Sequence, residues 1–107
     1  MIRLATLFSG IGAIEQALLK TSTPHKIIFA CDNGERELEL SKDEILRKTD
    51  NMSLEEKKQY IDDLYSKLKK SNCMYETYKL NYEIDDKDFY QDIRFLDGSI
   101  YKGQVDL

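Results

Sequence analysis

Residues 4–15 read LATLFSGIGAIE, and this stretch decides how the chain begins to fold. Its apolar start is typical of a buried strand, and Gly10 and Gly12 favour a tight turn directly after it. The residues beyond the glycines have the spacing of an amphipathic helix. A strand, a glycine turn and the free amides of a first helical turn together suit a nucleotide-like cofactor. A glycine pair inside an apolar stretch otherwise costs stability.

The form of the glycine loop distinguishes two cofactor classes. A dinucleotide site has the pattern Gly-x-Gly-x-x-Gly, in which the helix N-terminus holds a pyrophosphate. Here Glu15 occupies the third glycine position, and we expect its carboxylate to repel a diphosphate. S-adenosylmethionine has the same adenosine part without phosphate, and its cationic sulfonium tolerates nearby carboxylates. The loop therefore favours S-adenosylmethionine over a nicotinamide or flavin dinucleotide.

A second buried strand is predicted over residues 26–31, and it ends at Asp32. An acid about twenty residues past the glycines can accept hydrogen bonds from both ribose hydroxyls. The alternative is that residues 32–34 (DNG) form only a turn, because all three residue types are favoured in turns. At this spacing behind a glycine loop, we prefer the ribose role for Asp32.

Four motifs in this order resemble the C5-cytosine DNA methyltransferases. Residues 8–12 (FSGIG) are similar to the Phe-x-Gly-x-Gly motif that opens that family, and residues 75–82 (YETYKLNY) to its helix carrying Tyr-x-x-Asn. Residues 91–93 (QDI) resemble the Gly-Asp-Ile at the end of the family's third strand. Residues 103–107 (GQVDL) resemble the start of the fourth strand, which leads into the Pro-Cys catalytic loop. The central residues 35–73 lie outside the resemblance.

The resemblance implies roles for the residues of the glycine loop. Phe8 would stack on the adenine ring of S-adenosylmethionine, and Ser9 would lie beside it in the cofactor site. Gly10, Ile11 and Gly12 would supply backbone around the cofactor. The alternative for Phe8 is an ordinary core position at the end of a strand.

The resemblance also implies roles for residues after the second and third strands. Asp32 would accept from the ribose hydroxyls, at a position where many family members have Glu. Asn33 takes the position of a large apolar or aromatic residue that covers the adenine in the family. Asp92 would accept from the adenine amino group, and Ile93 would pack on the ring. The alternative for Asp92 is a cap for the turn that follows it.

The chemistry of cytosine methylation is not predicted within this chain. That reaction needs a cysteine thiolate to attack C6 of a flipped-out cytosine, with a glutamate assisting at N3. The family carries these groups in a Pro-Cys pair and a Glu-Asn-Val run, and neither sequence occurs here. The only proline is Pro24, Cys31 is expected to be a small buried residue, and Cys73 flanks a helix. We therefore predict no catalytic residue.

These observations predict the N-terminal segment of a methyltransferase catalytic domain, spanning residues 1–107 of a truncated, cloned or split enzyme. The implied fold is α/β, a partial Rossmann-like S-adenosylmethionine-dependent methyltransferase fold. Its first strand is central, with the second and third strands on one side and the segment around Val105 on the other. Double-stranded DNA would be bound by a missing C-terminal part or a partner chain that carries the Pro-Cys loop and the recognition region. A role in restriction-modification follows by analogy alone.

Residues 35–73 are predicted to be a helical insertion. Residues 41–44 (SKDE) and 53–56 (SLEE) have the form of capping boxes, in which a serine begins a helix. Helical spacing of apolar residues follows the second box, at Ile61, Leu64, Tyr65 and Leu68. The insertion is either a solvated helical hairpin packed on the edge of the sheet or a docking surface for a missing partner segment.

Composition limits the remaining classes of function. A formal net charge of -4 argues against a DNA-contacting surface on this segment, because phosphate binding calls for a basic face. Two cysteines and one histidine predict neither a disulfide framework nor a metal site. We expect no membrane span and no signal peptide, and hence a cytoplasmic protein. The alternative function is a non-catalytic nucleotide-binding or interaction module.

Overall fold

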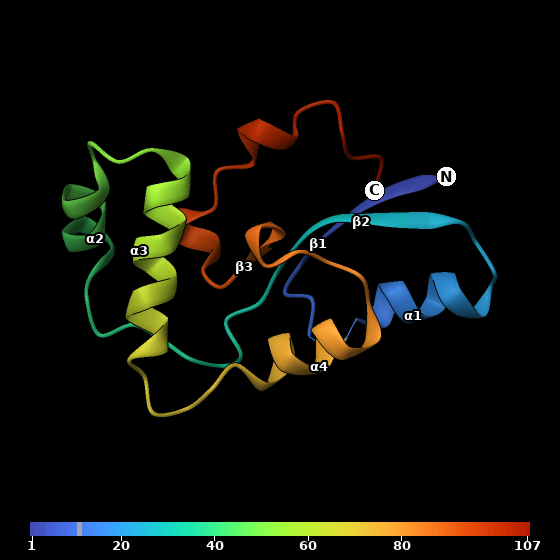
Figure 1. The fold of residues 1–107 in the computed structure, drawn as a ribbon, viewed down its shortest axis with the longest axis horizontal. Helices are drawn as coiled ribbons and strands as arrows, with labels where there is room; N and C mark the ends of the chain where they lie inside the picture. Colours follow the sequence, from blue (N-terminus) through green and yellow to red (C-terminus); the bar gives the residue numbers. More distant parts are fainter. Residues whose placement is uncertain (11) are drawn as a thin grey trace.

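In residues 1–10 and 12–107, which the computed structural model describes, three parallel strands form a sheet in the order β1-β2-β3 (Figure 1). The chain is therefore of the α/β class, with a small open sheet. The strands are β1 (Ile2–Leu7), β2 (His25–Cys31) and β3 (Phe89–Tyr90). The helices are α1 (Ala13–Lys20), α2 (Lys42–Thr49), α3 (Leu54–Ser66), α4 (Cys73–Asn81) and the short 3-10 turns η1 (Asp86–Asp88), η2 (Ile93–Phe95) and η3 (Gly98–Tyr101).

The strand register brings the carboxyl ends of all three strands to one edge of the sheet. β1 pairs with β2 from Ile2 opposite His25 to Leu7 opposite Cys31, and one irregularity follows Leu4. β3 pairs with the last two residues of β2. The predicted strands and their order are confirmed, although β3 is only two residues long.

The last residues of the chain lie along the edge of β1 that β2 leaves free. The Ala5 amide donates to the Leu107 carbonyl at 2.9 Å, and the Leu107 amide donates to the Arg3 carbonyl at 3.3 Å, which is the pattern of a parallel pair. Arg3 also forms an ion pair with Asp106 at 2.8 Å. The expected position of this segment, beside the first strand and opposite the second, is confirmed, but residues 103–107 are not a regular strand as the resemblance implied.

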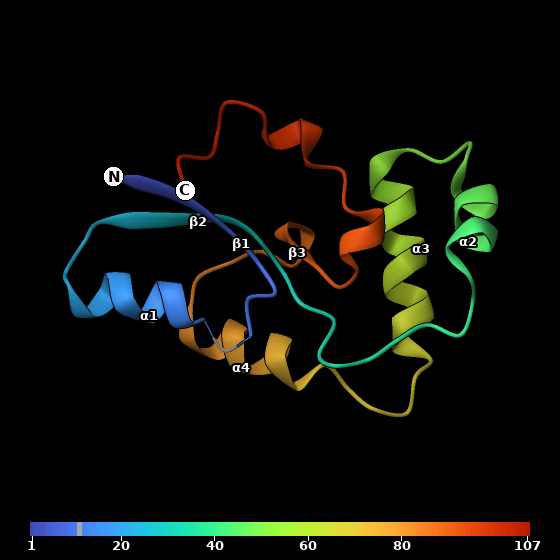
Figure 2. The same ribbon diagram turned by 180° about the vertical axis from the view of Figure 1, so that it is seen from behind.

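One face of the sheet is covered by α1 and α4 (Figures 1 and 2). Tyr78 of α4 and Tyr82, which directly follows α4, pack with Ala30 and Phe89 of the sheet in the first apolar core. α4 also confirms the helix predicted over residues 75–82, and it begins two residues earlier, after the Asn72 cap. Buried aromatic rings therefore hold the helices on the strands.

The helices α2 and α3 form a second core beyond β3. Ser41 and Ser53 cap α2 and α3 as the capping-box patterns predict, each accepting from an amide three residues later at 3.2 Å. The apolar face of α3 packs with residues of α2 and η2, and the buried members of this cluster are Ile45, Ile61, Tyr65 and Phe95. Figure 2 shows the α2–α3 hairpin at one end of the long axis. Residues 35–73 therefore contain a helical hairpin at the sheet edge, and this hairpin shares its apolar core with η2.

Candidate functional site

The carboxyl ends of β1, β2 and β3 surround a cavity of about 300 Å³. Ligands of parallel α/β sheets bind outside this end of the strands. The described residues that line the cavity include five of the predicted site residues: Phe8 after β1, Asp32 and Asn33 after β2, and Asp92 and Ile93 after β3. Three segments that are far apart in the sequence therefore meet as predicted.

A larger hollow of about 1190 Å³ lies elsewhere, against β2 and α3. Its lining mixes lysines with acids, and none of the glycine loop is among its described lining residues. The strand-end cavity is the stronger candidate because it lies outside the carboxyl ends of the parallel strands and is lined by residues that follow all three of them.

Phe8 is exposed at the rim of the strand-end cavity. Its side chain is 76% exposed, so the alternative of an ordinary core position is wrong. Its φ of 55° lies in the left-handed region, which costs a non-glycine residue about 1–2 kcal/mol. Strained, exposed aromatic residues of this kind are a reason to look for a ligand.

Ser9 supports the site from behind. The Ser9 amide donates to the Cys31 carbonyl at 3.0 Å and its hydroxyl lies 2.6 Å from that of Thr6, so Ser9 joins the ends of β1 and β2. Ser9, Gly10 and Gly12 are not among the described residues that line the cavity. The prediction for Ile11 lies outside the described residues.

The structure gives different reasons for a glycine at position 10 and at position 12. A methyl group on Gly10 would meet no described atom within 4 Å, so this position is open. The same group on Gly12 would lie 2.4 Å from the Tyr82 ring. Gly12 is required by close packing inside the protein as well as by its φ of 88°.

Asp32 both forms a turn and keeps room for a ligand. Its Oδ1 accepts from the Gly34 amide and its Oδ2 from the Gly10 amide, each at 2.8 Å. Asn33 accepts from the Glu35 amide at 2.9 Å, which confirms a turn at residues 32–34. A carboxylate has about four lone-pair positions, and these two amides fill one on each oxygen, so among the described residues a second position on each oxygen of Asp32 remains for a hydroxyl donor.

Asp92 is more fully engaged than Asp32. It caps η2, as the alternative interpretation held, with Oδ1 accepting from the Arg94 amide at 3.1 Å and from Arg94 Nε at 3.0 Å. Oδ2 accepts from Arg94 Nη2 and from the Tyr65 hydroxyl, both at 2.8 Å. Burial alone would raise the pKa of Asp92, but the hydrogen bonds from Arg94 and Tyr65 outweigh it and lower the pKa. Asp92 therefore stays ionised at neutral pH.

The cavity wall also includes residues that were not predicted as part of the site, and Arg36, Tyr65 and Arg94 are the most important of them. The sequence placed Tyr65 on the apolar face of the helix that became α3. Because a buried tyrosine hydroxyl usually has a hydrogen-bond partner, this position could have indicated a polar contact. Arg94 follows Asp92 by two residues and pairs with it. Arg36 is buried and lies just after the Asp32 turn.

Among the described residues that line the cavity, the acids Asp32, Glu37 and Asp92 outnumber the bases Arg36 and Arg94 by one. Arg94 is paired with Asp92, and Arg36 donates to the carbonyl oxygens of the surrounding backbone. Burial lowers the pKa of Arg36. The acids Asp32 and Glu37 complete the charged part of the lining. This balance suits hydroxyl donors and a cation better than a diphosphate.

Glu15 does not contribute to that balance, contrary to the sequence-based argument about diphosphate repulsion. Its side chain is 1% exposed and accepts from the hydroxyls of Tyr78 at 2.6 Å and Thr6 at 2.9 Å. Burial, followed by the hydrogen bond to Glu15, raises the pKa of Tyr78. The acid at the third glycine position therefore joins α1, β1 and α4.

Comparisons with protein-family models, curated proteins and solved structures found no match for this chain. What the cavity binds is therefore inferred from its own residues.

Nucleophilic and metal chemistry find little support in the described part of the chain. Cys31 lies at the cavity wall, but burial raises the pKa of its thiol to about 12, so it is a poor nucleophile. Among residues 1–10 and 12–107, no group of three or more His, Cys, Asp or Glu is placed to hold a metal ion. Within the same residues, no helix is long and apolar enough to cross a membrane.

Proposed function

We propose that this chain is the S-adenosylmethionine-binding N-terminal segment of a DNA cytosine-5 methyltransferase. One observation carries the proposal: Phe8, Asp32 and Asp92 follow three neighbouring strands and line a single cavity. These are the residues that the resemblance to the methyltransferase family links to the adenine ring, the ribose and the adenine amino group.

The cavity fits the adenosine part of the cofactor in size and chemistry. Its volume of about 300 Å³ lies at the lower end of the range of roughly 300–1,000 Å³ for ligand sites. The exposed Phe8 ring offers a stacking surface, and covering an aromatic side chain contributes about 1.5–3 kcal/mol. The two free lone-pair positions of Asp32 suit the two ribose hydroxyls.

The adenine amino group requires a rearrangement at Asp92. Its four lone-pair positions are filled by Arg94 and Tyr65. The Arg94 side chain is the more exposed of the two donors, so the amino group would take the place of its Nη2 at Oδ2. In this proposal Ile93, which also lines the cavity, packs on the ring.

Methyl transfer to C5 of cytosine in double-stranded DNA would need groups that this chain does not supply. The buried Cys31 thiol is a poor nucleophile, and the net charge of -4 does not favour binding to phosphates. The thiolate and the recognition region would come from the Pro-Cys part of the enzyme, in the same or a partner chain. This segment alone is expected to be inactive.

Calorimetric titration with S-adenosylhomocysteine, the unreactive product, tests the proposal. We expect micromolar binding to the unmodified chain and no binding of ATP or NAD. Asp32→Asn and Asp32→Ala should weaken binding at least about tenfold, because hydrogen bonds to a charged group contribute about 1.5–3 kcal/mol each. Asp63→Ala removes an exposed carboxylate from α3, outside the lining of this cavity, and is the matched control.

Failure to bind S-adenosylhomocysteine, or equal affinity for ATP, would overturn the proposal. A folded chain that binds none of these ligands would favour the alternative of an interaction module.

A further inference from the structure

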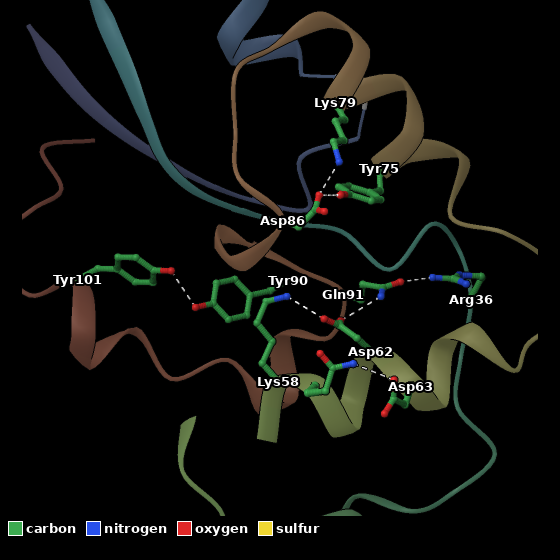
Figure 3. A network of polar contacts seen from close by, with 11 residues as sticks. Arg36, Lys58, Asp62, Asp63, Tyr75, Lys79, Asp86, Tyr90, Gln91 and Tyr101 are labelled. Carbon is green, nitrogen blue, oxygen red and sulfur yellow. Dashed lines mark hydrogen bonds and ion pairs between the residues drawn. The ribbon is translucent and has the colours of Figure 1, made fainter. Parts of the chain in front are cut away.

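The insertion is tied to the wall of the candidate cofactor cavity by a chain of polar contacts (Figure 3). Gln91 directly follows β3, and its Nε2 donates to the Asp62 carboxylate of α3 at 3.0 Å. The other end of the Gln91 amide accepts from Arg36 Nη2. Arg36 also donates to the carbonyls of Tyr65 at 3.3 Å and Asn33 at 3.1 Å. One guanidinium therefore links α3 to the turns that follow β2 and β3.

Tyr65 is the residue of α3 that reaches the Asp92 carboxylate. Its side chain is 1% exposed, and its ring packs with Ile61 and Phe95 in the second core. The Arg36 guanidinium lies 5.0 Å from the ring centre, on its face. The hydroxyl donates to Asp92 Oδ2 at 2.8 Å. Burial, followed by this hydrogen bond, raises the pKa of Tyr65, so the hydroxyl keeps its proton and remains a donor.

The two side chains that donate to Asp92 Oδ2 differ in freedom. Arg94 comes from the same turn as Asp92, and its side chain is 39% exposed. Tyr65 comes from α3, and its ring is held by apolar neighbours of the second core and by Arg36. A ligand amino group can replace the arginine, whereas the tyrosine stays.

We infer that Tyr65 is a positioning residue of the cofactor site, which holds the Asp92 carboxylate in the orientation that selects the 6-amino group of adenine. The inference rests on the proposed function and deepens it. The helical insertion then forms part of the site as well as the protein surface. Arg94 still holds Oδ1 through its amide and Nε. Once the ligand takes the place of Nη2, however, loss of the hydroxyl leaves Oδ2 without a fixed donor, so the carboxylate can turn about Oδ1. Selectivity for the amino group then falls while stacking and ribose binding remain.

The test compares S-adenosylhomocysteine with S-inosylhomocysteine, which has an oxygen in place of the 6-amino group. The unmodified chain should prefer the amino ligand at least about tenfold, the factor that corresponds to one hydrogen bond to a charged group. Tyr65→Phe keeps the ring in its core and should reduce this preference to about threefold or less. Its affinity for the inosine ligand should change little.

Tyr60→Phe is the matched control. Tyr60 lies on the same helix, packs against the same core, and its hydroxyl has no hydrogen bond to the described residues. This variant should keep the full preference for the amino ligand. A purely structural effect of losing a tyrosine hydroxyl would lower both affinities together and leave their ratio unchanged.

The outcomes separate the two proposals. If the unmodified chain discriminates and Tyr65→Phe discriminates equally well, the inference is overturned and the proposed function stands. If the unmodified chain binds neither ligand, both are overturned. If Tyr65→Phe does not fold, the unmodified chain with ¹³Cζ-labelled tyrosine decides. The Tyr65 signal must then shift with S-adenosylhomocysteine and not with the inosine ligand, and equal shifts overturn the inference.

Discussion

Gly12→Ala is expected to destabilise the chain much more than Gly10→Ala, although both glycines have positive φ. At Gly12 the φ of 88° costs an alanine about 1–2 kcal/mol. The new methyl carbon would also lie 2.4 Å from Cε2 and 2.8 Å from Cζ of Tyr82, and such overpacking costs about 1–3 kcal/mol more. The sum is a loss of about 2–5 kcal/mol in the free energy of unfolding. Gly10→Ala has only the backbone cost, about 1–2 kcal/mol.

Urea and thermal unfolding of the two variants measure this difference. At about 4–8 °C per kcal/mol for a chain of this size, Gly12→Ala should melt at least about 4 °C below Gly10→Ala. A double-mutant cycle with Tyr82→Ala identifies the cause, because removal of the ring should leave Gly12→Ala with the backbone cost alone. Equal stability losses for the two glycine variants, or an unchanged cost in the Tyr82→Ala background, would refute the packing argument.

Three further predictions concern single side chains. Arg94→Ala frees one lone-pair position on each oxygen of Asp92 while the Tyr65 hydroxyl still holds Oδ2, so it should tighten S-adenosylhomocysteine binding several-fold in calorimetry; weaker binding would show that the guanidinium assists the ligand. The hydrogen bond from Arg3 holds the pKa of Asp106 at about 2. The stabilisation that the ionised Asp106 carboxylate gives the folded chain is therefore present above about pH 4 and is lost as the pH falls to about 2. Asp106→Asn should therefore flatten the acid fall of the urea midpoint, and an unchanged profile contradicts this. Burial raises the pKa of Cys31 to about 12, whereas Cys73 of α4 is exposed. A thiol reagent should therefore label Cys73 at once and Cys31 only on unfolding, and equally fast labelling of both would argue against the burial of Cys31.

Features with local signals were predicted well from the sequence. The first strand, its glycine turn and the following helix lie where the apolar spacing indicated. The two serine caps and the apolar face of α3 are also confirmed, because each depends on residues only three or four positions apart. The meeting of Phe8, Asp32 and Asp92 at one cavity follows from the parallel order of the strands.

Contacts between distant segments were not predictable in the same way. Helical spacing shows that Tyr65 is buried, but the identity of its hydroxyl partner depends on how α3 meets β3. Glu15 looked like a residue facing the cofactor because the loop was considered alone, whereas its partner Tyr78 lies on α4. The close approach at Gly12 likewise involves Tyr82, far along the sequence.

The central claim is that S-adenosylmethionine binds at the carboxyl ends of the three strands, and amide chemical-shift mapping tests it most directly. The ¹⁵N-labelled chain is titrated with S-adenosylhomocysteine. The account predicts shifts that gather at the amides of Phe8, Gly10, Asp32, Asn33 and Ile93. Shifts confined to the larger hollow, lined by residues such as Lys26, Lys58 and Tyr101, or no shifts at all, would contradict it.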